Sequence, residues 1–394
     1  MKATRLWDKG TPINQQILEF TVGQDHILDQ RLIPYDLTVS IAHAQMLGEQ
    51  NHLTADEVQK LTQALEELRI EDIQISIEEE DCHTAIENRL TQKLGDIGGK
   101  IHLGRSRNDQ VLTALRLYYR DAYKEIAKMT EDVNASLSTI IFEQGETKIP
   151  GYTHLQQAMP SSVRLWAEAY QTEISLSAST FCATENLINL NPLGSAAGYG
   201  TPGLTLDRES TTKKLGFERA HEPVTAPQLS RGKAESALAF SLCLIIQDLG
   251  RIAADICLYN SQEFAIVTLA DDITTGSSIM PQKRNPDVFE LIRAHSAQAP
   301  ADLQAIQNIT LKMTSGYHRD LQLIKEPLFR LIDRTHQTLQ ITAYALTRIT
   351  FNADRATQIT DPGIHAAEAA FALVQSEKIS FREAYRRIAA QKPN

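Results

Sequence analysis

The sequence has only four cysteines among 394 residues, and no two of them form a CxxC pair. Zinc sites and disulfide frameworks normally show such pairs or a regular cysteine spacing. Cys182, Cys243 and Cys257 lie within long apolar patterns of helical period, whereas Cys82 stands apart. We therefore expect buried free thiols, as in a protein of the reducing cytoplasm.

An excess of positive charge is also missing. The chain carries 39 lysines and arginines against 49 aspartates and glutamates, which gives a net charge of −10 at pH 7. This balance argues against a general nucleic-acid binder and against a polybasic membrane binder. A small anionic substrate is compatible with it, because a binding site needs only local cations.

Long apolar runs are equally scarce. No run of about 18 apolar residues indicates a membrane span. The first residues, MKATRLWDKGTPINQQ, lack the apolar core of a signal peptide. We therefore predict a cytoplasmic protein without a membrane partner.

What the sequence does contain is helical periodicity over unusual lengths. Apolar residues recur every three or four positions through residues 109–144, and similar patterns cover 161–190 and 233–269. The stretch 237–246, ALAFSLCLII, is apolar nearly all round, which predicts burial on every side. A chain of this size can hardly cover several rods of roughly 50 Å. We expect the rods to bundle with copies of the chain, a long monomeric bundle being the alternative.

Segments rich in glycine and proline separate these patterns and are predicted to be loops. They cover residues 149–160, 191–203 and 270–286. Shorter helical patterns cover 54–70 and 361–392, and strand signals are few.

These elements predict an all-α fold with three helical domains around a central long-helix bundle. We place the N-terminal domain at residues 1–105, the bundle at 106–350 and a shortened C-terminal domain at 351–394.

Four segments carry polar residues that helix packing does not require. The first, HLGRSRNDQ at residues 102–110, precedes the first long helix and holds Arg105, Ser106, Arg107 and Asn108. The start of a helix favours anions, and arginine matches the geometry of a carboxylate. The alternative is a helix cap with surface arginines.

The second segment, PGYTHLQ at residues 150–156, places Thr153 and His154 on a loop that leads into the second long helix. A loop histidine can transfer protons near neutral pH. A lone histidine is, however, more often structural.

The third segment is GSSIMPQKRNP at residues 276–286. Its serines need a nearby cation and hydrogen-bond donors to act as a base, and Lys283 offers the positive charge. Gly276 would let the loop close over a site and exclude water. The alternative is a flexible surface loop.

The fourth segment, GYHRDLQLIK at residues 316–325, presents a hydroxyl, an amide and a cation at Tyr317, Gln322 and Lys325. They lie within about two helical turns of one another. An ordinary amphipathic segment is the alternative.

In this order, the four segments resemble the argininosuccinate lyase branch of the fumarase/aspartase superfamily. GSSIMPQKRNP is similar to the signature loop of the superfamily, and HLGRSRNDQ resembles the segment that marks argininosuccinate lyases within it. PGYTHLQ, YHRDLQ, EDCHTAIENRL at 80–90 and NPLGSAAGYGTPGLTLDRE at 191–209 are also similar to this branch. The resemblance covers roughly residues 6–389.

The resemblance implies a homotetramer with a central helix bundle and active sites composed from three chains. It implies the cleavage of argininosuccinate to arginine and fumarate by β-elimination, with no cofactor and no metal. In such an enzyme Ser277 would be the general base, His154 paired with Glu290 would transfer a proton, and Lys283 would stabilise the intermediate. The residues that match substrate contacts of the family are Ser106, Arg107, Asn108, Thr153, Asn285, Tyr317, Gln322 and Lys325.

The sequence departs from the family pattern at several places. Asp25 stands where many members have a substrate-contacting serine, and its carboxylate would repel an anionic substrate unless it points away or meets a cation. Residues 220–235 lack the Ser-Asp-Arg-Asp pattern and offer Arg231 and Lys233 instead. The chain ends soon after SFREAYRRIA at 380–389, so we expect a shortened C-terminal domain.

Two other functions compete with this prediction. A sister lyase acting on adenylosuccinate or on fumarate and malate is one, and the GRSRNDQ segment argues against it. A δ-crystallin-like structural homologue is the other. The presence of Ser277, His154, Lys283 and Glu290 argues against an inactive chain.

Overall fold

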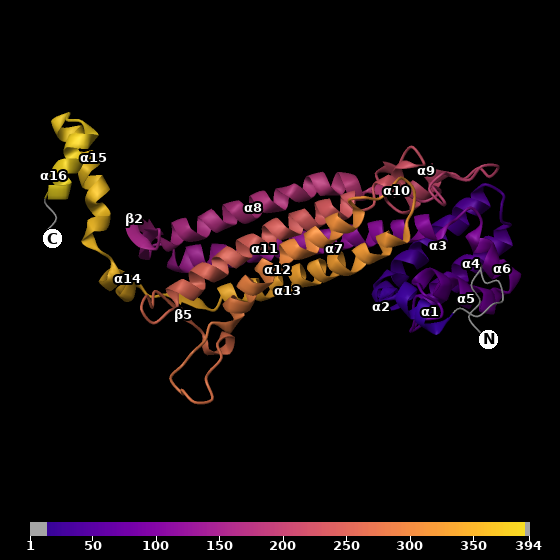
Figure 1. The fold of residues 1–394 in the computed structure, drawn as a ribbon, viewed down its shortest axis with the longest axis horizontal. Helices are drawn as coiled ribbons and strands as arrows, with labels where there is room; N and C mark the ends of the chain where they lie inside the picture. Colours follow the sequence, from indigo (N-terminus) through magenta and orange to yellow (C-terminus); the bar gives the residue numbers. More distant parts are fainter. Residues whose placement is uncertain (1–13, 391–394) are drawn as a thin grey trace. The chain divides into compact units, whose positions relative to one another are not determined.

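The computed structural model describes residues 14–390, and helices dominate it (Figure 1). The chain forms two compact units. The first contains the described residues up to Glu125 together with Thr180–Leu242 and Pro300–Asp333. The second contains Ile126–Ser179, Cys243–Ala299 and the residues from Arg334 onward. The predicted all-α class is confirmed, and the division into three domains stays a prediction.

Short helices open the first unit and appear in indigo and violet in Figure 1. The helix Ala55–Leu68 follows the cap residue Thr54, whose side chain accepts from the Glu57 backbone N–H while the Glu57 carboxylate accepts from the Thr54 backbone N–H. This capping box explains why the predicted helix 54–70 starts where it does. These elements are α1 Gln15–Val22, α2 Asp25–Leu28, η1 Asp29–Leu32, α3 Ile33–Glu49, α4 Ala55–Leu68, α5 Cys82–Leu94, α6 Asp96–Gly99 and η2 Lys100–His102.

Long helices follow, and their apolar spacing explains their length. The helices predicted at 109–144 and 161–190 are present almost as expected. The third ends at Tyr259, earlier than the predicted 269, because Val267–Leu269 leaves the helix and pairs with Ile349–Phe351. The long helices are α7 Arg107–Gln144, α8 Val163–Ile188, α11 Lys233–Tyr259, α12 Asp287–Thr310 and α13 Lys325–Leu346.

Polar contacts join the long helices within each unit. In the first unit the fully buried Arg116 of α7 donates to the Leu187 carbonyl of α8 at 2.8 Å. In the second unit Trp166 and Tyr170 of α8 both donate to the Asp255 carboxylate of α11, at 3.0 and 2.7 Å. Buried polar groups need such partners, so these contacts fix which helix faces meet.

A small hydrophobic core in the first unit ties α3 and α7 to the loops that follow α8. Tyr35 packs against it. Its buried members are Val39, Ala42, Leu117, Leu193, Leu215 and Phe217.

Three two-stranded sheets complete the described fold. β1 Lys148–Thr153 and β2 Gln156–Ser162 pair antiparallel where the sequence predicted a loop at 149–160. The turn residues His154 and Leu155 both have positive φ, 53° and 57°, as a two-residue hairpin requires. The prediction failed because strand pairing depends on this turn rather than on a local pattern of apolar residues.

The other two sheets are short. β3 Leu190–Asn191 pairs in parallel with β4 Arg219–Ala220, and β5 Val267–Leu269 pairs antiparallel with β6 Ile349–Phe351. The remaining elements are α9 Arg208–Lys214, α10 Ala226–Leu229, η3 Asp271–Ile273, η4 Arg319–Ile324, α14 Ala353–Ile359, η5 Pro362–His365, α15 Ala366–Glu377 and α16 Phe381–Ala390.

Two expectations about burial are wrong in part. All four cysteines are free, but Cys182 is exposed and Cys257 is only half-buried, because an apolar pattern of helical period does not fix the burial of each residue within it. Within residues 237–246, Phe240 is 51% exposed, so this stretch is not buried on every side within one chain.

The stretch Ala226–Tyr259 is long and apolar enough to cross a membrane by length and composition, but 61% of its most apolar window is buried, as in a core helix.

His43 on α3 is a buried group whose ionisation opposes folding. Its ring is fully buried, and Nε2–H donates to the Leu103 carbonyl at 2.8 Å, while Nδ1 has no partner among the described residues. Burial, assisted by the nearby Arg105 guanidinium, lowers the pKa of His43 to about 3. The folded chain therefore keeps His43 neutral under conditions in which an unfolded histidine is protonated.

We predict that acid destabilises the first unit through His43. As pH falls from about 7 to about 5, only the unfolded histidine gains a proton, which removes roughly 2 kcal/mol of unfolding free energy. In His43→Gln, whose amide can still donate to Leu103, this loss should be smaller by about that amount. Urea unfolding at both pH values measures the difference, and equal losses in the two proteins would contradict the prediction.

Candidate active site

A polar pocket of about 220 Å³ lies within the first unit. Its walls come from α2 and η1, from the start of α5, from the start of α7, and from residues 317–325. Acidic and basic side chains face it in equal number. The ionic residues are Asp25, Asp29, Glu80, Asp81, Arg107, Arg231, Arg319 and Lys325.

The start of α7 is held in place by Asp109. Its fully buried carboxylate accepts from the backbone N–H groups of Ser106, Gly194 and Ala196, each at 2.9 Å. Burial raises the pKa of Asp109, and these three donors oppose that shift. Asp109 thereby holds Asn108 and the loop 191–203 beside each other. Asp109 belongs to the segment 102–110, but the sequence did not indicate this structural role.

Arg107 is already paired inside the pocket. Its Nη1 donates to the Asp81 carboxylate, and also to the Thr84 hydroxyl at 2.5 Å. Asp81 caps α5 by accepting from the Thr84 backbone N–H at 2.7 Å. Burial alone would raise the pKa of Asp81, but the Arg107 guanidinium leads the effects that lower it, to about 2. The two side chains therefore form a charged pair at physiological pH.

Lys325 binds two carboxylates at the other side of the pocket. Its Nζ lies 2.7 Å from Asp29 Oδ1 and 2.8 Å from Asp25 Oδ1, and its side chain is 3% exposed. Burial would lower the pKa of Lys325, but Asp29 and Asp25 raise it above the ordinary value. The carboxylate of Asp25 thus meets a cation. From the sequence, Asp25 is expected to repel an anionic substrate unless it points away or meets such a cation.

The segment 316–325 contributes further pocket groups. Gln322 donates to the backbone carbonyls of Thr21 and Val22, at 2.9 and 3.0 Å, and accepts from Arg319. The Tyr317 ring lies under the Arg231 guanidinium, 5.7 Å from its centroid. Gln322 is thus anchored to the backbone of α1, and its predicted contact with substrate stays a prediction.

Arg231 is a buried cation that the family pattern did not supply. Its side chain lines the pocket, and the residue is 6% exposed. Nη2 donates weakly to the Leu321 carbonyl at 3.4 Å, whereas Nε and Nη1 have no partner among the described residues. Lys233, the other charge singled out in the sequence, is exposed and does not line the pocket.

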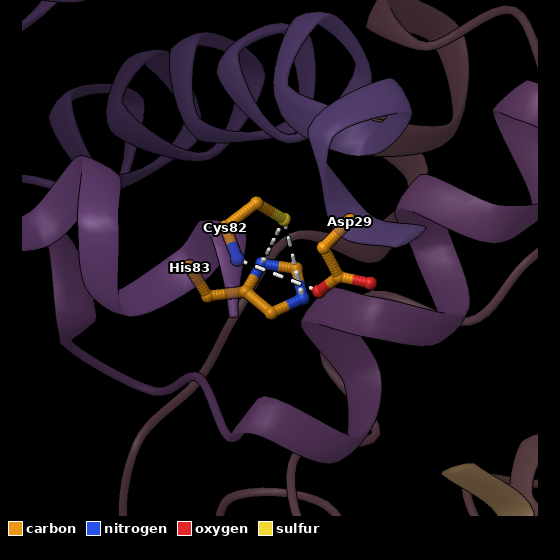
Figure 2. Close-up of side chains that lie close together, drawn as sticks. All are labelled: Asp29, Cys82 and His83. Atoms are coloured by element: carbon orange, nitrogen blue, oxygen red, sulfur yellow. Dashed lines mark hydrogen bonds between the residues drawn. The ribbon is translucent and has the colours of Figure 1, made fainter. Parts of the chain in front are cut away.

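Asp29, Cys82 and His83 lie close together, as Figure 2 shows, and Asp29 and His83 line the pocket. Their possible ligand atoms lie within 4.8 Å of one another, and the Cys82 backbone N–H donates to Asp29 Oδ2 at 3.4 Å. The ligand atoms are otherwise engaged, because Asp29 holds Lys325 and His83 Nδ1 lies 2.9 Å from the Asp36 carboxylate.

Ionisation also disfavours a metal at this cluster. Burial raises the pKa of the Cys82 thiol, and Asp36 raises the pKa of His83 in spite of its burial. A metal needs a thiolate and a neutral imidazole, whereas this arrangement favours a thiol and an imidazolium. Asp29 and His83 therefore belong to ion pairs of the pocket wall, with Lys325 and Asp36, and Cys82 contributes a neutral thiol beside them.

The predicted proton-transfer residues belong to the second unit. Thr153 and His154 are exposed on β1 and at the β1–β2 turn, so the predicted loop is a hairpin tip. Glu290 is exposed in the first turn of α12. Within the described part of one chain, no hydrogen bond or ion pair joins His154 to Glu290, and their pairing stays a prediction.

The signature loop lies between η3 and α12 and is drawn as an open loop in Figure 1. Backbone bonds between Thr275 and Asn285, at 2.9 and 3.3 Å, close its base. The Ser277 Oγ accepts from the backbone N–H groups of Ile279 and Met280, at 3.3 and 3.2 Å. Donors of this kind favour an ionised oxygen, while the Lys283 side chain remains exposed.

The pocket therefore collects part of the predicted site. Ser106 lies beside the pocket but does not line it, and Thr153, His154, Ser277, Lys283, Asn285 and Glu290 are in the second unit. The predicted residues that line the pocket are Arg107, Asn108, Tyr317, Gln322 and Lys325.

Comparison with known proteins agrees with these motifs. A family model described as "Lyase" matches residues 17–301. The argininosuccinate lyase of Thermotoga neapolitana is 40% identical over 98% of this chain and 97% of its own length. That of Phocaeicola vulgatus is 44% identical over 81% of this chain and 72% of its own length.

Solved structures show the same fold. A variant of EDDS lyase with bound fumarate has a TM-score of 0.81 at 25% identity, over 96% of this chain and 76% of that one. A class II fumarase from Schistosoma mansoni, 16% identical, has a TM-score of 0.75 over 94% of this chain and 91% of that one. From the family match and the near full-length relatives, the chain belongs to the argininosuccinate lyases, C–N lyases of the fumarase/aspartase superfamily.

Proposed function

We propose that the chain is an argininosuccinate lyase that splits argininosuccinate reversibly into arginine and fumarate. The observation that carries this proposal is the 40% identity to an enzyme of that name over nearly the full length of both chains. The pocket supports it, because argininosuccinate bears several carboxylates and two cationic groups, and the pocket presents both signs of charge. The reaction belongs to arginine biosynthesis, and we place it in the cytoplasm.

We propose that the active site is composed from several subunits of a homotetramer. The binding pocket belongs to the first unit, whereas the acid–base residues lie on an exposed hairpin and an exposed loop of the second. Large apolar side chains on the long helices support self-association. Leu165 and Leu176 on α8 are 58% and 57% exposed, and Phe240 on α11 is 51% exposed. Exposed large apolar side chains on long helices are typical of surfaces that are covered in an assembly.

In this mechanism Ser277 removes the Cβ proton of the succinyl group. The backbone N–H groups of Ile279 and Met280, together with the charge of Lys283, stabilise the Ser277 alkoxide. The electron pair of the broken C–H bond moves into the adjacent carboxylate and forms an aci-carboxylate with two negative charges. Asn285 and Lys283 are the donors that stabilise this species in a dry site.

The second step breaks the C–N bond. The electron pair returns to form the double bond of fumarate, and the guanidino nitrogen leaves with the electrons of the C–N bond. His154, oriented by Glu290, gives that nitrogen a proton directly or through a water molecule. Arginine and fumarate are the products, and neither step needs an oxidant or a cofactor.

The first test is the substrate itself. We expect the purified protein to form fumarate from argininosuccinate, as measured by the ultraviolet absorbance of fumarate. Adenylosuccinate and malate, offered at the same concentration, should give a rate lower by at least about a hundredfold. Preference for either compound would identify a sister lyase, and no turnover of any of them would indicate a structural homologue.

Ser277→Ala tests the general base. We expect kcat to fall by at least about a thousandfold, because the variant loses its primary proton-transfer group. The neighbouring Ser278→Ala is the matched control and should keep kcat within about tenfold, since its side chain makes no hydrogen bond among the described residues. Near-normal turnover of Ser277→Ala would refute the assignment.

His154→Asn tests the proton-transfer histidine and separates chemistry from assembly. We expect kcat to fall by roughly a hundredfold or more, the usual contribution of general acid catalysis. Since His154 is exposed at a hairpin tip, the variant should still form tetramers by light scattering. Loss of tetramers would instead assign His154 a structural role.

A further inference from the structure

The end of the pocket at Lys325 carries more negative than positive charge. One ammonium group there meets two carboxylates, those of Asp25 and Asp29. Asp29 is fully buried, and its second oxygen accepts from the Cys82 backbone. The Asp25 side chain is 15% exposed and lines the pocket, and its Oδ2 has no protein partner among the described residues. An acceptor of this kind suits a cationic ligand group.

Most other charges of the pocket are paired with one another. Arg107 binds Asp81, and Arg319 lies 3.6 Å from Glu80. Arg231 is the exception. It is only 6% exposed, and it forms no ion pair with the described residues. A buried guanidinium in which two nitrogens, Nε and Nη1, lack acceptors is costly, so a ligand that brings a carboxylate to it is favoured.

A ligand that carries an ammonium and a carboxylate satisfies both groups. We propose that Asp25 binds the α-ammonium and Arg231 the α-carboxylate of the arginine part of the substrate. This inference rests on the proposed function and names the residues that select an amino acid as the leaving amine. Lys325 then acts as the positioning residue that holds Asp25 toward the pocket.

The surroundings of Asp25 give the proposal a pH signature. The pKa of Asp25 is raised to about 6, chiefly by burial; Asp29 and Asp81 contribute to the rise, and Lys325 opposes it. The carboxylate is therefore charged above about pH 6 and protonated below it. Arginine should bind more weakly as pH falls through this range, because a protonated Asp25 no longer attracts an ammonium group.

The test compares ligands that lack one group each. Calorimetry on the tetramer measures binding of L-arginine, of agmatine, which lacks the carboxylate, and of 5-guanidinopentanoate, which lacks the amine. Asp25→Asn should weaken arginine by about tenfold and leave 5-guanidinopentanoate unchanged, whereas Arg231→Met should weaken arginine similarly and spare agmatine. The pH dependence of arginine binding near pH 6 should disappear in Asp25→Asn.

Fumarate is the internal control, because neither variant removes a group assigned to it. Its affinity should stay within about twofold in Asp25→Asn, and Asp25→Glu should restore part of the arginine affinity. The exposed Asp96→Asn, in the first turn of α6, is the matched control for a lost surface charge. Loss of both fumarate and arginine in Asp25→Asn would overturn the proposal, because Asp25 would then only maintain the pocket.

The outcomes also separate this inference from the proposed function. If argininosuccinate gives no fumarate, the proposed function fails whatever the ligands show. If it does give fumarate but both variants bind arginine as the unmodified enzyme does, only the assignment of Asp25 and Arg231 fails.

Discussion

Burial of charge is the constraint on which the pocket of the first unit depends. An isolated buried ion costs several kcal/mol, so each must find a partner or a set of hydrogen bonds. Asp109 finds three backbone N–H groups, and Asp29 finds Lys325 and the backbone of Cys82. Apart from the local bond between Ser106 and Asp109, each of these contacts joins segments that are distant in the sequence. Satisfying the charges therefore also places the walls of the pocket.

The same constraint explains why the pocket can be selective. Charges that are paired within the protein, such as Arg107 with Asp81, maintain the shape of the pocket but attract a charged ligand only weakly. Asp25, which binds only Lys325, and Arg231, which forms no ion pair among the described residues, retain unused hydrogen-bonding capacity. In the proposed enzyme, this mixture of ions would let an acidic protein bind a substrate with several carboxylates without a general positive surface.

The proposed proton-transfer groups, His154 and Ser277, follow a different rule. His154 lies at a hairpin tip, and Ser277 lies on a loop closed only by a short backbone bridge. Such positions leave reactive side chains exposed and free to approach a substrate held by other segments. Binding groups on buried ionic networks and reactive groups on exposed turns suit an enzyme in which assembly or closure excludes water before the chemistry begins.

Much of this protein was determined by its sequence alone. The apolar spacing of α7 and α8 predicted their extent to within a few residues, and the helical pattern at 54–70 predicted α4, because these signals are local. The motifs around Asn108 and Ser277 indicated the family, because residue types and their order can be read directly from the sequence. The sequence also showed that Asp25 departs from the family pattern, but it did not show that Lys325 is its partner.

Only the tertiary structure decided the rest. The end of α11 at Tyr259 depends on a strand that pairs with Ile349–Phe351, and the hairpin at His154 depends on pairing across a turn. Whether Asp25 repels or supports a substrate depends on Lys325, which lies far along the chain. Contacts between distant segments have no local signature, because they arise from packing and from the need to neutralise buried charge.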